Sequence, residues 1–165
     1  MLFRSIQDKT YTGKPITQDV IITKNGKPVT VDISYKNNIN AGTAQIIIDG
    51  KGEYSGRITE TFKITKAKQP FTVKASVKSV KADKLRKAKR TVKKAFKVKN
   101  NKGALSLKKL SGSKYIKISK KGVVTVKKGK YKKNTLLKIK VRITAKGNSN
   151  YKKGSKNVTV KIKVK

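Results

Sequence analysis

The chemistry that this chain can offer is that of positive charge. Its 165 residues include 45 Lys and Arg against 7 Asp and Glu, which gives a formal net charge of +38. Only five of the basic residues are Arg, so the charge comes almost entirely from Lys. Lys presents a compact point charge, whereas Arg offers a planar fork for bidentate contacts with phosphates and base edges. This composition predicts many weakly specific contacts with a polyanion.

The positive charge is concentrated in the second part of the chain. Residues 1–66 contain ten basic and six acidic residues, a net charge of +4. Residues 67–165 contain 35 basic residues and one acid, Asp83, a net charge of +34. A change this sharp indicates two domains with different electrostatic roles, of which the second is the one expected to bind a polyanion.

The basic residues that we select as candidates lie in clusters or at outward positions of expected strands. Taken singly, a Lys on a strand is most often a solvated residue that also blocks aggregation at sheet edges. A surface with positive and negative side chains mixed would already be soluble, however, so the near absence of acids from residues 67–165 favours contact with a polyanion. The candidate polyanion-binding residues are Lys84, Arg86, Lys87, Lys89, Arg90, Lys117, Lys120, Lys121, Lys138, Lys140, Arg142, Lys161 and Lys163.

The residue types needed for catalysis and metal binding are scarce. The chain has no His and no Cys, and the basic part has a single carboxylate. General acid–base catalysis draws mostly on His, Asp and Glu, and transition metals bind mostly to His and Cys. A calcium site needs several carboxylates that converge on one point. We therefore predict that the protein is not an enzyme and that it uses no cofactor and no metal.

Period-2 alternation with turn residues between the runs predicts strands throughout. In the first part, Asn25-Gly26 predicts a tight turn because both positions tolerate positive φ. In the second part, Leu137 and Ile139 alternate with Lys138 and Lys140, and the last run repeats the pattern. The expected strands cover residues 16–23, 28–35, 43–49, 57–65, 71–77, 91–98, 104–110, 115–118, 123–127, 137–144 and 158–164.

The segment 81–90 permits a helix, but its apolar residues are few and widely spaced, and we predict no helix there.

The charge composition changes near Pro70, which also interrupts strand pairing. We interpret residues 1–5 as a leader that is not native to the protein, residues 6–66 as the first domain, 67–70 as a linker and 71–165 as the second domain. No apolar run reaches the roughly 20 residues of a membrane helix, so no membrane span is expected.

Four blocks of the first part resemble a repeat module of bacterial surface proteins. The blocks are YTGKPI at 11–16, SYKNNINAGTA at 34–44, GKGEYSG at 50–56 and TFKI at 61–64. Such modules occur in tandem in large secreted proteins of Firmicutes, especially clostridia, and are described as Ig-like. The resemblance implies an extracellular location on a Gram-positive cell surface. The four strands of this part also fit a β-grasp fold, and that alternative stays open here.

The basic part resembles the Lys-rich β-sandwich module that follows such repeats. The similar blocks are GVVTVKKG at 122–129, VRITAKGNSNYK at 141–152 and VTVKIKV at 158–164. The order of strands and turns is similar to cadherin-like and Ig-like sandwiches, without the acidic ligands of cadherin calcium sites. We therefore predict an all-β chain of two small antiparallel β-sandwich domains in tandem, of Ig-like or cadherin-like type.

These features predict a non-catalytic segment of a cell-surface protein. The first domain would be a spacer, and the second would attach to an anionic cell-wall polymer, either teichoic acid or an acidic glycan. Further domains of the same parent chain would precede residue 1. One alternative is a structural stalk without a specific ligand. Another is a nucleic-acid-binding protein, since counterion release alone drives binding to nucleic acid in vitro at low salt.

Overall fold

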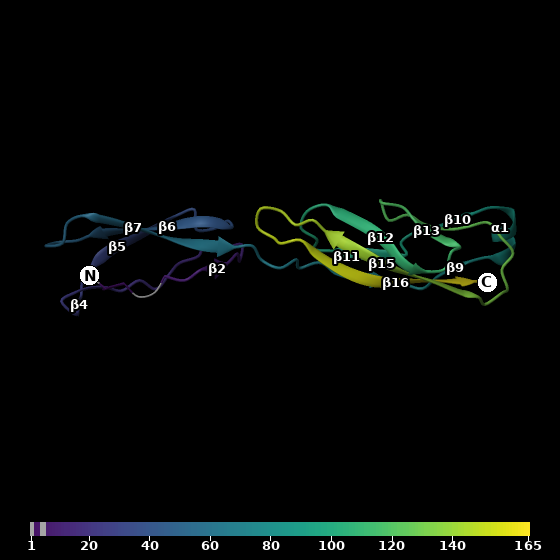
Figure 1. The fold of residues 1–165 in the computed structure, drawn as a ribbon, viewed down its shortest axis with the longest axis horizontal. Helices are drawn as coiled ribbons and strands as arrows, with labels where there is room; N and C mark the ends of the chain where they lie inside the picture. The colour runs from purple at the N-terminus through teal and green to yellow at the C-terminus, as the bar shows by residue number, and fades with distance from the viewer. Residues whose placement is uncertain (1, 4–5) are drawn as a thin grey trace. The chain divides into compact units, whose positions relative to one another are not determined.

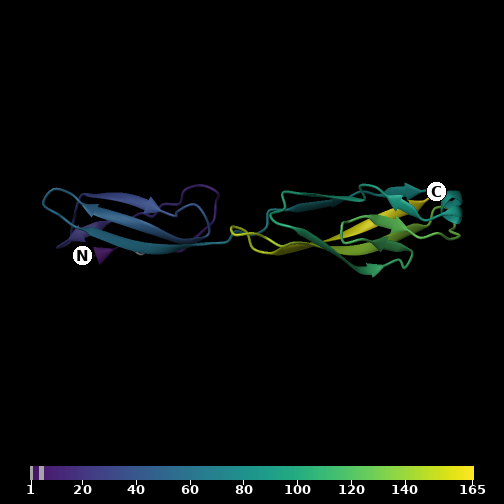
Figure 2. The ribbon, with the colours of Figure 1, turned by 90° about the horizontal axis from the view of Figure 1, so that it is seen from above.

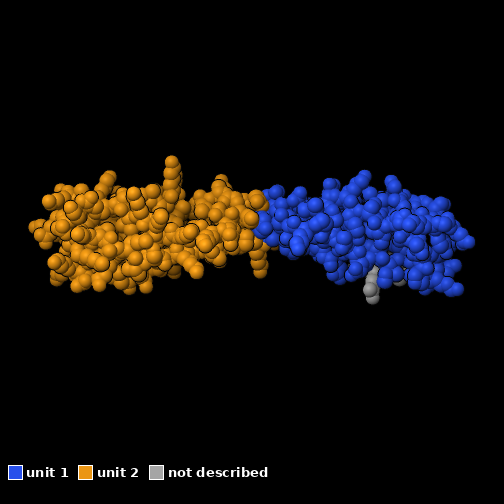
Figure 3. Space-filling model, turned by 180° about the vertical axis from the view of Figure 1, so that it is seen from behind, with its two compact units in different colours: residues 1–67, 149–151 blue, residues 68–148, 152–165 orange. Residues whose placement is uncertain are grey.

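The computed structural model describes residues 2–3 and 6–165, whose strands are seen from two sides in Figures 1 and 2. The chain forms two compact units, coloured separately in Figure 3. Met1–Ala67 with Ser149–Tyr151 form unit 1, and Lys68–Asn148 with Lys152–Lys165 form unit 2. Of the expected leader, residues 1, 4 and 5 lie outside the described residues, and Leu2–Phe3 forms the short strand β1.

Unit 1 is built on a four-stranded sheet in the order β2-β7-β6-β5. A second, smaller sheet has the order β1-β3-β4. Alternate residues of β6 and β7, such as Ala44, Ile46 and Phe62, are buried in the core against Ile16 and Ile22. The strands are β2 (Lys9–Thr10), β3 (Ile22–Lys24), β4 (Lys27–Pro28), β5 (Val31–Lys36), β6 (Gly42–Gly50) and β7 (Arg57–Thr65).

The turn expected at Asn25-Gly26 is confirmed. The two residues have φ of 49° and 78°, the positive values that a tight two-residue hairpin requires, and they join β3 to β4. The strand expected at 16–23 is wrong for all but its end, because only Ile22–Lys24 is extended and paired. In the segment before β3, the backbone forms hydrogen bonds with loops and side chains in place of a neighbouring strand. The Ile16 amide, for example, donates to the Asn38 carbonyl at 2.8 Å.

Unit 2 has a four-stranded sheet in the order β12-β15-β16-β9 that packs over two smaller sheets, β11-β8 and β10-β14-β13. The alternation expected at the end of the chain is confirmed: Leu137, Ile139, Val160 and Ile162 are buried in the core between the layers. The strands are β8 (Thr72–Ala75), β9 (Lys78–Val80), β10 (Arg90–Val92), β11 (Phe96–Lys99), β12 (Leu105–Gly112), β13 (Ile116–Ile118), β14 (Val124–Val126), β15 (Leu136–Ala145) and β16 (Gly154–Val164).

The prediction that segment 81–90 holds no helix is wrong. Ala82–Lys87 form the short helix α1 at the end of unit 2 where the C-terminus lies (Figures 1 and 2). Ala82 and Leu85, spaced three residues apart, are buried on one side of α1 and anchor it to the core. Two anchors are enough for a helix of six residues, which is why a sparse apolar pattern was misleading.

Two further details differ from the expectation. The strand expected at 91–98 is divided into β10 and β11, because Lys94 has a φ of 52° and turns the chain. Two pairings at sheet edges, β2 with β7 and β16 with β9, are parallel, whereas antiparallel pairing was expected throughout.

The fold class itself is confirmed: the chain is all-β apart from α1, and a β-sandwich fits it. In the described part of unit 1, the four-stranded sheet faces strands and irregular segments and no helix, which is the sandwich arrangement and not that of a β-grasp fold. None of the described helices is long and apolar enough to cross a membrane.

Candidate polyanion-binding surface

The outer surface of the large sheet of unit 2 carries a row of cationic side chains. Because successive residues of a strand point to opposite faces, the buried residues of β15 and β16 force their neighbours outward. These neighbours are exposed, except for the half-buried Thr144. We define the outer face by its six cations: Lys108 on β12, Lys138, Lys140 and Arg142 on β15, and Lys161 and Lys163 on β16.

The strand register sets the spacing of these cations. Lys138 lies directly opposite Lys161, and Lys108 lies directly opposite Arg142. Cross-strand neighbours have Cβ atoms about 5 Å apart, and same-face residues along a strand are about 6.7 Å apart. Polar residues lie opposite two of the cations: Thr159 is opposite Lys140, and Asn157 is opposite Arg142. The exposed Leu136 is opposite Lys163, so the outer face is an array of positive charge with hydroxyl and amide groups and one apolar side chain between.

The electrostatics of the outer face are unfavourable in the free protein. Like charges directly opposite each other on a sheet are destabilising, as are Lys138 and Lys161 here. The acids that form ion pairs lie in unit 1, where Asp32 binds Lys51 at 2.7 Å and Asp49 binds Arg57 at 2.6 Å. The hydrogen bond from Arg57 lowers the pKa of the Asp49 carboxyl. Unit 2 contains a single acid, so its repulsion would be relieved by an external anion.

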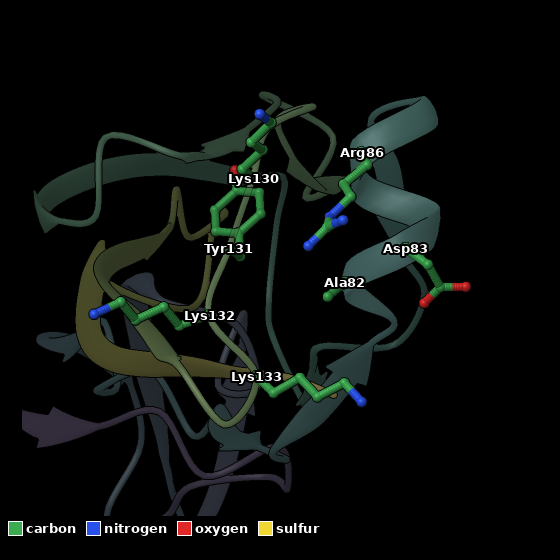
Figure 4. Close-up of a pocket in the computed structure, with 7 residues that line it drawn as sticks. All are labelled: Ala82, Asp83, Arg86, Lys130, Tyr131, Lys132 and Lys133. Carbon is green, nitrogen blue, oxygen red and sulfur yellow. The ribbon is translucent and has the colours of Figure 1, made fainter.

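Asp83, the single acid of unit 2, lies on α1 beside a cavity of 580 Å³. Arg86, Lys130 and Lys133 also line this cavity, together with Lys132. In Figure 4 the Arg86 guanidinium extends toward the loop that carries Lys130, whereas the Asp83 carboxylate is directed away from it. The cavity is therefore cationic despite the acid on its rim.

Tyr131 forms one wall of the same cavity. Its ring packs edge-on against Tyr115 with centroids 5.4 Å apart, and its hydroxyl donates to the Lys127 carbonyl at 2.8 Å. Burial raises the pKa of the Tyr131 phenol, and Tyr115 adds to the effect. Both rings are thus held by internal contacts.

The remaining candidates fall into separate groups. Lys89 and Lys117 line a cavity of 400 Å³ together with Lys127. Lys84 and Arg90 line a third cavity, of 320 Å³, on the other side of α1 from Arg86. Exposed side chains without such a grouping are those of Lys87, Lys120 and Lys121. The structure therefore brings together five of the thirteen sequence candidates on the outer face and distributes the other eight over separate parts of unit 2.

Six cations that the candidate set omitted belong to these groups, namely Lys81, Lys108, Lys127, Lys130, Lys132 and Lys133. Lys108 is on the outer face, and the alternation of Leu105 and Leu107 with Ser106 and Lys108 was the signal that could have found it. Lys81 lines the cavity of Lys84 and Arg90. The neighbouring Lys109 has a structural part: its ammonium group donates to the Ser113 and Ile116 carbonyls at 2.5 and 3.0 Å.

Within residues 2–3 and 6–165 there is no group of three or more His, Cys, Asp or Glu side chains that could hold a metal ion. The arrangement in unit 2 can instead bind anions at several points.

No protein-family model matches the chain, and no curated protein matches it. Two solved structures show similarity over 99% of the chain. One is the protocadherin gammaB7 EC3-6 cis-dimer, with a TM-score of 0.47, 11% identity and 50% of that chain covered. The other is a SusE-like, surface-located polysaccharide-binding protein from the Bacteroides thetaiotaomicron heparin utilisation locus, with a TM-score of 0.40, 15% identity and 34% covered. The chain thus spans half or less of the length of each. Similarity of this order assigns no function to it.

Proposed function

We propose that the chain is a non-catalytic attachment segment in which unit 2 binds an anionic polymer and unit 1 serves as a spacer. The observation that carries the proposal is the outer face, where six cations and intervening polar groups lie on one sheet surface without an acid. A rigid sheet holds these charges at fixed spacings, so an extended polyanion can meet several of them at once.

The binding expected from such a surface is multivalent and electrostatic. Exposed charges act through solvent, with a Debye length of about 8 Å at physiological ionic strength. Each contact is therefore weak, and affinity arises from their number and from the release of counterions by the polymer. Such a surface would retain a protein on a polymer-rich layer without recognising one sequence of units.

Among polyanions, we propose a cell-wall polymer of a Gram-positive bacterium, either teichoic acid or an acidic glycan, with the protein outside the cell. The sequence resemblance to Firmicutes surface modules supports this choice. Features of the outer face also support it over nucleic acid, because single-strand binders place aromatic rings among their cations. The outer face has no aromatic residue, and Arg142 is its one Arg.

Sedimentation with purified Gram-positive cell walls at about 0.15 M salt tests the proposal. We expect the chain to pellet with intact walls and to remain in the supernatant with walls stripped of teichoic acid and acidic glycan. Excess duplex DNA serves as a competitor. Tight binding to DNA without retention on walls would favour the nucleic-acid alternative. Binding to neither would leave the structural stalk without a specific ligand as the remaining alternative.

A further inference from the structure

Arg90 is positioned differently from the cations of the outer face. It lies on β10 with the same strand parity as the buried Val92, opposite the buried Val126. Its side chain therefore starts on the inner side of the sheet β10-β14-β13, at the first residue of the edge strand β10. The residue is half-buried, and its Nε atom is buried.

The Arg90 Nε–H lacks an acceptor among the described residues. A buried donor that has lost water without gaining a partner is costly, and the cost is greater for a charged group. Because the Nε atom is buried, no external acceptor reaches it in this structure, and a ligand would be held by the terminal N–H groups of the same guanidinium.

The cavity beside Arg90 has the composition of an anion site. Its volume is 320 Å³, and the residues that line it are Val80, Lys81, Lys84, Arg90 and Thr91. Three of the five are cations from three successive segments: the residue before α1, α1 itself and the start of β10. No carboxylate is among the lining residues.

We propose that this cavity, the Arg90 site, binds a single tetrahedral oxyanion, a phosphate or a sulfate group. The two terminal N–H groups of a guanidinium form a fork that matches two oxygens of such a group. The Lys81 and Lys84 ammonium groups would neutralise its charge as point charges, and the Thr91 hydroxyl can donate one more hydrogen bond. Val80 contributes an apolar wall.

The inference deepens the proposed function and rests on it in one respect, namely that phosphate or sulfate is the group that the polymer carries. The outer face binds by number of charges, whereas the Arg90 site would select the chemistry of one group. A polymer with phosphate or sulfate groups would thus be preferred over a polycarboxylate of equal charge density.

NMR titration of the full chain with inorganic phosphate, sulfate and acetate, at constant ionic strength maintained with chloride, tests the site. We expect saturable shifts of the Arg90 Nε–H and of the Thr91 amide with phosphate or sulfate, and the ion that saturates at lower concentration identifies the group. Shifts that rise without saturation, or that spread evenly over the lysines, would overturn the proposal. Equal binding of acetate would overturn the assignment to a tetrahedral oxyanion.

Arg90→Lys keeps the charge and removes the fork. We expect it to weaken phosphate or sulfate binding about tenfold or more, since it loses a charge-assisted hydrogen bond. Arg57→Lys is the matched control in unit 1, outside the proposed binding surfaces, and should leave this affinity unchanged. Equal affinity of Arg90→Lys and the wild type would refute the site. Should Arg90→Lys fail to fold, Lys84→Gln on the exposed side of α1 and the wild-type Nε–H signal still decide the question.

Failure of this site is distinguishable from failure of the proposed function. Retention on cell walls with no saturable phosphate or sulfate binding would refute the Arg90 site alone. Saturable ion binding without retention on walls would refute the proposed function alone.

Discussion

Replacement of three outer-face cations by Gln is the perturbation that addresses the proposed binding mode most fully. The variant Lys138→Gln, Lys140→Gln, Lys161→Gln keeps the side-chain stems and removes the like-charge pair across β15 and β16. Its matched control is a second triple variant in the opposite layer of unit 2. There Lys74, Lys97 and Lys99 are exposed on β8 and β11 and change to Gln with the same loss of net charge.

The size of the effect follows from counterion release. For a flexible polyanion, each contact lowers the slope of log K against log salt by about 0.7 and contributes about 0.8 kcal/mol at 0.15 M salt. Six contacts on the outer face therefore give a slope of about −4. Loss of three contacts should change the slope to about −2 and weaken binding by about 2.4 kcal/mol, or about 50-fold.

The assay is the affinity of each protein for purified wall teichoic acid at several salt concentrations. We expect the control variant to retain most of the wild-type affinity, because its three lysines lie off the outer face. An equal loss in both triple variants would refute the reasoning, since it would show that net charge alone determines binding.

Three further predictions concern the parts of unit 2 that hold these surfaces in place. Leu85→Ala should destabilise unit 2 by about 2–5 kcal/mol in a denaturant titration, because the Leu85 side chain of α1 is fully buried. A loss below 1 kcal/mol would contradict the claim that Leu85 anchors α1 to the core. Lys109→Met should destabilise unit 2 by about 1–3 kcal/mol, because two part-buried carbonyls lose their donor, yet leave the salt slope of polymer binding unchanged. A smaller slope would mean that Lys109 binds polymer. The pKa of Tyr131 is raised, mainly by burial and to a smaller extent by Tyr115, so the free energy of unfolding should fall as the pH rises from the ordinary Tyr value of about 10 through the raised pKa. Tyr115→Phe should lower the pKa of Tyr131 only part of the way in a spectrophotometric titration. No change in that pKa would exclude the Tyr115 contribution.

The outer positions of β15 and β16 could be predicted from the sequence because their alternation is strict over many residues. Burial of Ile139, Val141 and Val160 leaves Lys138 and Lys140 only one direction to point. Local patterning of this kind needs no knowledge of which strands are neighbours. The same logic placed β6 and β7 correctly in unit 1.

The parts that could not be predicted depend on contacts distant in sequence. The alternation in β12 predicts that Lys108 points outward, but its place beside Arg142 depends on the register of β12 with β15, which a bulge between Lys109 and Ser111 changes further along. Arg90 lies at the Arg90 site because β10 begins three residues after the end of α1, and the sequence pattern predicted neither the break before β11 nor the helix. A charge count treats Arg90 and Lys161 alike, whereas their burial separates them.

Protection of lysines from acetylation, read by mass spectrometry on the full chain with saturating wall teichoic acid, tests the central claim most directly. The proposed function predicts protection of Lys108, Lys138, Lys140, Lys161 and Lys163, with little change at Lys74, Lys97 and Lys99. Protection spread equally over both sets would contradict the claim that the outer face of the large sheet holds the polymer.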